Sequence, residues 1–194
     1  MLTLTTLRRV AIGGAIAMVT SAAAFAQSTI LVVDTTKAYN DSAVGQHIAR
    51  QVETMAKSTG AQLSAQATPL ESQKKNLELQ TDGKSEAQIR QDAALVSQLQ
   101  TFQKSALKLR QDTAVAQREL QMTEAKARQL VSAKMKTIID QIARERNADV
   151  VLEKQLVIYG EPADITATVL SRLNAEMTTV PVVRERIPVD RTGS

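Results

Sequence analysis

Residues 84 to 159 contain neither glycine nor proline, the two residue types that most often interrupt a helix. Near the start of this stretch, Ser85 is followed three residues later by Gln88, the pattern of a capping box that begins a helix. The sequence therefore predicts one helix from residue 85 to about 146, roughly 90 Å long at about 1.5 Å per residue. A compact domain of this size has no room for such a helix, so we expect an elongated molecule.

A second long helix is predicted before this one. The segment TDGK at 81–84 is a turn signal, and helical sequence extends back from it to about residue 42. We therefore expect two antiparallel helices joined at Gly83. Within the first, Thr68, Pro69 and Glu71 resemble a cap, a first-turn proline and a capping acid, which predicts a kink or a restart of the helix there.

The apolar residues of the returning helix recur at intervals of three, four or seven, which is typical of a helix packed along a partner. The members of this stripe are Ile89, Val96, Leu99, Phe102, Ala106 and Leu109. Residues 110–119 offer only alanine and valine, whereas large apolar residues return at Leu130, Val131, Met135, Ile138, Ile139 and Ile142. The hairpin should therefore pack better near its base than along its middle.

Two short apolar runs, ILVV at 30–33 and DVVL at 149–152, are typical of buried strands. A helix starting near Pro162 or Ala163 can cover only part of the sheet, and two strands alone are marginally stable. We therefore expect strands from several chains to combine into one body from which hairpins project. The residues assigned to this shared body are Ile30, Leu31, Val32, Val33, Val150, Val151 and Leu152.

These elements define a mainly α protein with a small β body, an α+β fold. The predicted organisation is a signal peptide at 1–26, a body at 27–41 and 148–180, an arm at 42–147 with its turn near 81–84, and an extended or disordered tail at 181–194. In the signal peptide, Arg8 and Arg9 precede an apolar run, and AFA at 24–26 offers a cleavage site. The mature chain is therefore expected to be exported.

The composition argues against several classes of function. The chain has no cysteine, which excludes disulfides, thiol catalysis and cysteine metal sites. Removing Arg8 and Arg9 from 24 basic residues leaves 22 against 20 acidic ones, a charge of +2 that gives little support to nucleic-acid binding.

No catalytic constellation is recognisable. Asp34 follows a strand, where phosphotransfer enzymes can place a nucleophile, but a second acid and a glycine-rich phosphate loop are missing, so capping the next element is the simpler role. His47 is the single histidine and cannot form a metal-binding pair. We expect no enzyme activity, no metal and no cofactor.

The mature chain resembles the Skp/OmpH family of periplasmic chaperones over nearly its whole length. The matching segments are ILVVDTTKAYNDSAVGQ, the turn near TDGK, LQTFQKSALKLRQD and, most specifically, ADVVLEKQLVIYGEPADIT. The resemblance implies a periplasmic homotrimer whose β body carries three helical arms around a cavity. Unfolded outer-membrane proteins would be held in that cavity without ATP.

The resemblance places client contacts on the arm. The candidate residues are Ile89, Val96, Leu99, Phe102, Lys104, Lys108, Leu109 and Arg110. Residues 91–146 hold ten basic and six acidic side chains, a surplus of +4 that would attract acidic clients. Lipopolysaccharide contact is not carried over, because four basic and four acidic residues balance at 71–90. The alternative function is an envelope coiled-coil scaffold or spacer with one fixed partner.

Overall fold

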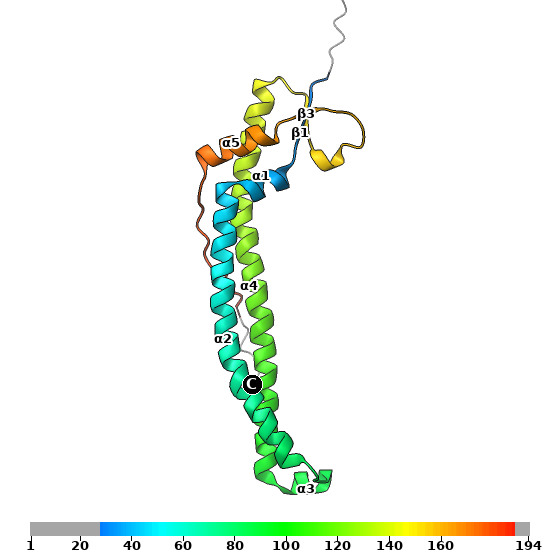
Figure 1. Cartoon of the computed structure of the whole chain (residues 1–194), viewed down its shortest axis with the longest axis vertical. Coiled ribbons are helices and arrows are strands. Elements are labelled where there is room, and N and C mark those ends of the chain that lie inside the picture. Colours follow the sequence, from blue (N-terminus) through cyan, green and yellow to red (C-terminus); the bar gives the residue numbers. More distant parts are fainter. Residues whose placement is uncertain (1–27, 189–194) are drawn as a thin grey trace, which may run out of the picture.

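A computed structural model describes residues 28–188 as a long helical hairpin that carries a small sheet at one end (Figure 1). The predicted signal peptide lies outside the described residues. The elements are β1 (Ile30–Val33), α1 (Thr35–Asp41), α2 (Ala43–Thr81), α3 (Glu86–Gln91), α4 (Ala93–Glu145), β2 (Val150–Glu153), the 3₁₀ turn η1 (Lys154–Leu156), β3 (Ala163–Asp164) and α5 (Thr166–Glu176). The mainly α class with a small sheet is confirmed.

The corner between α1 and α2 places the start of the hairpin beside the sheet. Asp34 caps α1 by accepting a hydrogen bond from the Lys37 amide, so the capping role predicted for Asp34 is confirmed. Ser42 caps α2, and its hydroxyl also donates to the carbonyl of Tyr39 at 2.7 Å. The backbone turns so tightly that a Cβ on Gly45 would lie 2.0 Å from the Tyr39 oxygen.

Replacing Gly45 with Ala is therefore expected to destabilise the fold, because the added methyl group overlaps a backbone atom that cannot move without opening the corner. The expected loss is about 1 to 3 kcal/mol of unfolding free energy, the usual cost of overpacking. Thermal unfolding followed by circular dichroism measures it. Gly60→Ala is the matched control, since a Cβ there meets nothing within 4 Å and should leave the melting temperature unchanged or higher.

The sequence predicted a kink or a restart of the helix at Thr68 and Pro69. The helix does not restart there, because α2 continues through Pro69 to Thr81. Thr68 does not cap a new helix. Its hydroxyl donates to the Ser64 carbonyl one turn earlier at 3.1 Å. Pro69 is exposed, so the missing amide hydrogen bond is tolerated on the solvent side of a helix that the hairpin partner supports.

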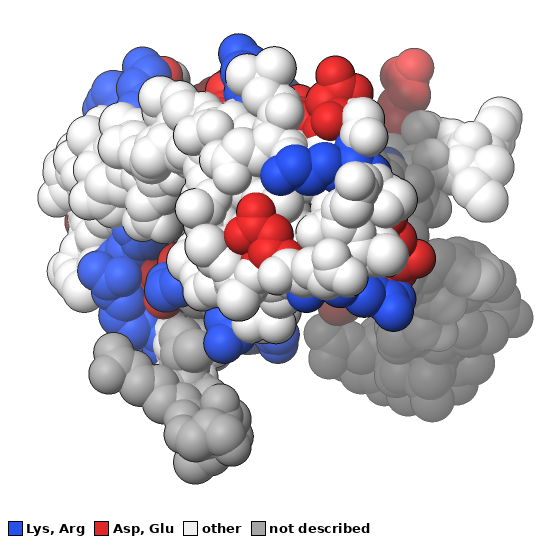
Figure 2. All heavy atoms as spheres, turned by 90° about the horizontal axis from the view of Figure 1, so that it is seen from below, with Lys and Arg blue, Asp and Glu red and all other residues white. Residues whose placement is uncertain are grey.

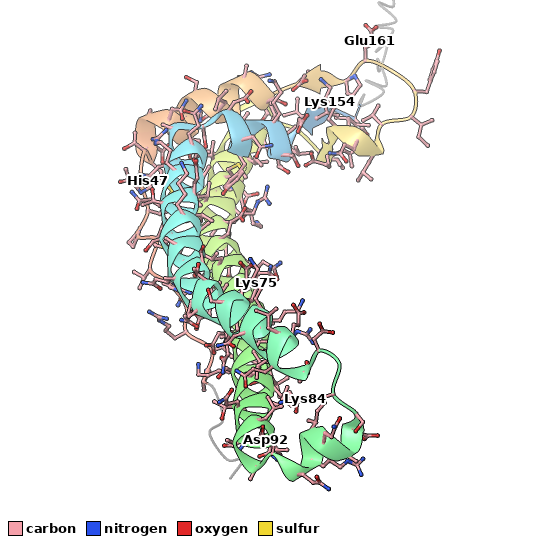
Figure 3. The ribbon with its side chains drawn as sticks, turned by 60° about the horizontal axis from the view of Figure 1, so that its bottom comes forward. His47, Lys75, Lys84, Asp92, Lys154 and Glu161 are labelled. Carbon is pink, nitrogen blue, oxygen red and sulfur yellow. The ribbon has the colours of Figure 1, made fainter. Side chains whose placement is uncertain are left out.

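The hairpin tip divides the predicted second helix in two. The capping box of Ser85 and Gln88 is present, but it starts the short α3 and not the whole returning helix. Asp92 then caps α4 by accepting a hydrogen bond from the Leu95 amide at 3.0 Å. Figure 3 shows Lys84 and Asp92 together at this end, where their charged groups lie 3.8 Å apart. The single helix predicted from residue 85 is therefore wrong at its first turn.

The sheet is parallel, with strand order β2-β1-β3. Asn147, in the left-handed region at φ 48°, follows the end of α4. Asp149 then anchors β2, since its carboxylate accepts the Thr29 amide at 2.8 Å. The two-stranded prediction missed β3, which occupies Ala163 and Asp164, the place where the last helix was expected to begin; α5 begins at Thr166 instead.

One core joins the sheet to the base of the hairpin. Leu31 and Val33 point from β1 into it, and helices α1, α2, α4 and α5 supply most of the remaining buried side chains. The largest fully buried members include Ile48, Ile138, Ile142, Ile165 and Leu173. Among the described residues, no helix is both long and apolar enough to cross a membrane.

Candidate functional site

The face of the sheet opposite the helices is apolar and only partly covered. Paired residues in a parallel ladder point to the same face, and the register pairs Ile30 with Val150 and Val32 with Leu152. Val32 is buried, but Ile30 is 42% exposed and Val150 is 45% exposed. We call these four residues the apolar sheet face.

An apolar loop lies beside this face. The connection from β2 to β3 projects from the body (Figure 1), and it carries Leu156, Ile158 and Tyr159. Ile158 is fully exposed and Tyr159 nearly so, which is unusual for large apolar side chains that have nothing to bind. Together, the sheet face and the loop form a surface that one chain leaves uncovered.

The seven predicted body residues therefore divide into two groups. Leu31 and Val33 are buried by this chain's own helices, and Val151 packs against the same core. Ile30, Val32, Val150 and Leu152 belong to the opposite face. Sequence reasoning could not separate the groups, because a continuous apolar run gives no alternation between faces. It also did not name Leu156, Ile158 and Tyr159 as site residues, although they lie in the segment ADVVLEKQLVIYGEPADIT that carries the most specific resemblance.

A salt bridge holds the loop of the body to the edge of the sheet. The Lys154 ammonium lies 2.7 Å from the Asp164 carboxylate, which also accepts the Thr166 amide at 2.8 Å. The hydrogen bond from Lys154 makes the largest contribution, and together with the hydrogen bonds from Thr166 it lowers the pKa of Asp164 to about 2. The same carboxylate thus fixes the loop and the start of α5.

Asp164→Asn is expected to lower stability by about 0.5 to 1 kcal/mol at neutral pH, the range for a partly exposed ion pair screened by solvent. Because the folded pKa lies below the unfolded one, this contribution is present above about pH 4 and is lost as the pH falls toward 2. Urea unfolding at pH 7 and pH 2 tests it. A difference between wild type and variant that is as large at pH 2 as at pH 7 would exclude the ionised carboxylate as its cause.

The predicted stripe of the arm lies mostly against the partner helix. Val96, Leu99, Phe102 and Leu109 are half-buried, and a shallow pocket combines Phe102 and Leu109 with Ala67 and Leu70 of α2. Ile89 lies apart from them on α3. The fully buried residue at this end is Leu95, which the stripe omitted because the helix restarts at Asp92.

The arm also exposes apolar side chains that the stripe did not include. Leu79 is 79% exposed, and Leu107, Met122 and Leu130 are each about half exposed along the length of α4. Lys104, Lys108 and Arg110 are exposed as well, and Lys108 pairs with Asp112 one turn on. The arm surface thus consists of separate apolar side chains surrounded by charged ones.

The charges at the hairpin end are mixed. Figure 2, seen from that end, shows basic and acidic side chains interspersed over a largely uncharged surface. This agrees with the zero balance of residues 71–90. Within residues 28–188, no group of three or more histidine, cysteine or acidic side chains could hold a metal ion.

The fold and this surface define a class of protein in which a small β body carries one long helical arm, with apolar surface left open on both. Residues 29–173 match the model of the family described as outer membrane protein (OmpH-like), and the chain belongs to that family. A search of curated proteins finds no match.

A solved structure shows the same architecture. It is described as an outer membrane chaperone (OmpH-like) from Caulobacter crescentus CB15 and is 26% identical to this chain. The match covers 84% of this chain and 94% of the other, with a TM-score of 0.68. The resemblance to the OmpH family stated from the sequence is therefore confirmed.

Proposed function

We propose that this protein is an ATP-independent periplasmic chaperone that holds unfolded outer-membrane proteins between its arms and prevents their aggregation. The observation that carries the proposal is the arm surface, on which Leu79, Leu107, Met122 and Leu130 are exposed one at a time. Separate apolar contacts suit an unfolded chain of variable sequence, because each is weak and none demands a fixed partner shape. Family membership and the description of the Caulobacter relative support the same function.

A homotrimer is part of the proposal. The apolar sheet face and the residues Leu156, Ile158 and Tyr159 form a surface that needs a cover, and a second and third copy would supply the same surface. Three arms would then project from one body and define the space for a client. The surplus of +4 at residues 91–146 would draw acidic segments toward that space and would weaken with salt.

The alternative, an envelope scaffold or spacer with one fixed partner, predicts a continuous apolar or complementary patch on the arm. The dispersed apolar side chains favour the chaperone. Light scattering of two unrelated unfolded barrels, diluted from urea with and without this protein, distinguishes the two functions. A chaperone suppresses aggregation of both barrels at comparable concentrations. Unchanged aggregation of both at several-fold trimer excess contradicts the proposal.

A further inference from the structure

Residues 177–188 leave α5 and run back along the hairpin without regular secondary structure (Figure 1). We call this segment the strap. It begins in the core of the body, where Val180 is buried, and then reaches the middle of the arm. The strap lies beyond residues 29–173 that match the family, so the family match does not account for it.

The strap binds a polar groove between the two long helices. The guanidinium of Arg184 donates to Glu119 of α4 at 2.9 Å and to the Thr59 hydroxyl of α2 at 2.8 Å. Glu119 is only 4% exposed, and Arg186 approaches it to 3.5 Å. Arg184 of the strap therefore bridges the two long helices, because it contacts the Glu119 carboxylate on α4 and the Thr59 hydroxyl on α2.

The strap's backbone is recognised as well. The amide of Glu185 donates to Thr123 Oγ1 at 2.9 Å, and the amide of Ile187 donates to Glu119 Oε1 at 3.2 Å. The two acceptors stand one helical turn apart, about 5.4 Å along the axis. Two residues of extended chain span about 6.6 Å, so the acceptors match alternate amides of any extended peptide.

The contacts specify a ligand chemistry. Both carboxylate oxygens of Glu119 receive their hydrogen bonds from the strap, so an occupant that reproduces these contacts brings a cation and an amide to this acid. Apolar side chains flank the cation, with Val182 and Ile187 half-buried. An extended segment with one arginine between aliphatic residues meets each requirement, and the amide contacts do not depend on the other side chains.

We propose that this groove of Thr59, Glu119 and Thr123 is a binding site for extended, arginine-containing segments of unfolded clients, and that the strap occupies it until a client displaces it. The inference rests on the proposed chaperone function. The inference adds a defined client contact on the arm. It also makes the strap an internal competitor that limits access of clients to this contact.

Locking the strap tests displacement. The chain has no native cysteine, so Lys126→Cys with Glu185→Cys gives one reactive pair at a site where the native side chains form a 2.6 Å ion pair. A short reducible thiol-reactive linker joins them. The locked protein should need at least fivefold more chaperone for half-suppression of client aggregation, and reductant should restore the wild-type value. Equal protection before and after reduction overturns displacement.

The matched control is Glu145→Cys with Arg172→Cys, an ion pair that joins α4 to α5 within the body and leaves the strap free. This lock should leave protection unchanged. If it lowers protection as much as the strap lock, general stiffening explains both results and the proposal fails.

A second measurement tests the groove without a client protein. It remains informative even if the wild type does not protect any unfolded barrel from aggregation. Arg184→Glu places a second carboxylate against Glu119 and should release the strap. A labelled peptide with the sequence of residues 178–188 should then bind this variant at least tenfold more tightly than the wild type, measured by fluorescence anisotropy. A peptide with glutamate in place of the arginine that corresponds to Arg184 should bind at least tenfold more weakly. Equal binding of the two peptides, or none to the released variant, overturns the site.

Discussion

Replacing Val150 with Asp is expected to give a folded protein that no longer assembles. Val150 lies on the apolar sheet face and is 45% exposed in one chain, so a carboxylate there stays hydrated and costs the monomer little. In the proposed trimer the same position is covered, and an uncompensated buried charge costs about 3 to 5 kcal/mol. At about 1.4 kcal/mol per tenfold change, that weakens assembly by at least about a hundredfold.

Sedimentation velocity at micromolar concentration, together with circular dichroism, measures the result. The predicted outcome is a helical monomer where the wild type is a trimer. Val33→Asp is the matched control, because Val33 sits on the same sheet but faces the core and is buried by this chain's own helices. It should unfold the body. A trimeric Val150→Asp variant would exclude the sheet face as the assembly surface.

Excising the distal arm is expected to remove most of the client protection while leaving assembly intact. Ala67 and Arg110 line one shallow pocket between α2 and α4, so a short glycine turn from Ala67 to Gln111 can close the hairpin after residues 68–110 are removed. The core around Ile138 and Ile142 and the groove at Glu119 are both retained. The excision removes Leu79 and Leu107, two of the exposed apolar side chains proposed to contact clients.

The shortened protein should sediment as a trimer and give scattering close to that of an unprotected barrel. Salt provides an internal check, since an electrostatic contribution from the arm of the intact protein should weaken above physiological ionic strength. Full protection by the shortened trimer would move the binding surface to the body or to the retained part of the arm, which includes Glu119. Loss of the trimer would show that the distal hairpin contributes to assembly.

Local signals predicted most of the fold. The cap at Ser85 depends on a side chain three residues from the backbone amide that donates to it, so the sequence reveals this cap directly. The break at Asp92 was missed because its neighbours favour helix, and a single aspartate in a long helical pattern is usually a solvent-exposed residue. The strand β3 was missed because two residues cannot show a period.

Contacts between distant residues could not be predicted in the same way. Arg184 and Thr59 are 125 residues apart in the sequence, and no local pattern links a C-terminal arginine to the middle of the arm. Glu119 was counted only as one of the arm's acidic side chains, although it is buried and paired. Most of the large residues at the base of the hairpin were recognisable, because Val131, Met135, Ile138 and Ile142 recur at helical spacing, whereas Leu130 from the same set is 48% exposed.

The arm is stabilised differently along its length. Near the base, Val131, Met135 and Ile138 pack into the core, whereas the middle buries Ala116, Glu119 and Thr123 and depends on the strap for hydrogen bonds. Small side chains bury little apolar area, so this section gains less from packing than the base does. An arm of this construction can bend at its middle at lower energetic cost than at its base.

The central claim is that the arms of several chains enclose one client. The stoichiometry of the client complex tests this claim most directly, because it requires several copies of this chain around a single client molecule. Native mass spectrometry of this protein mixed with a single unfolded outer-membrane barrel gives that number. The account predicts three chains with one barrel, and a much smaller share of barrel in complex for the trimer that lacks residues 68–110. One chain bound to one barrel, or the same complex with the shortened arm, would contradict it.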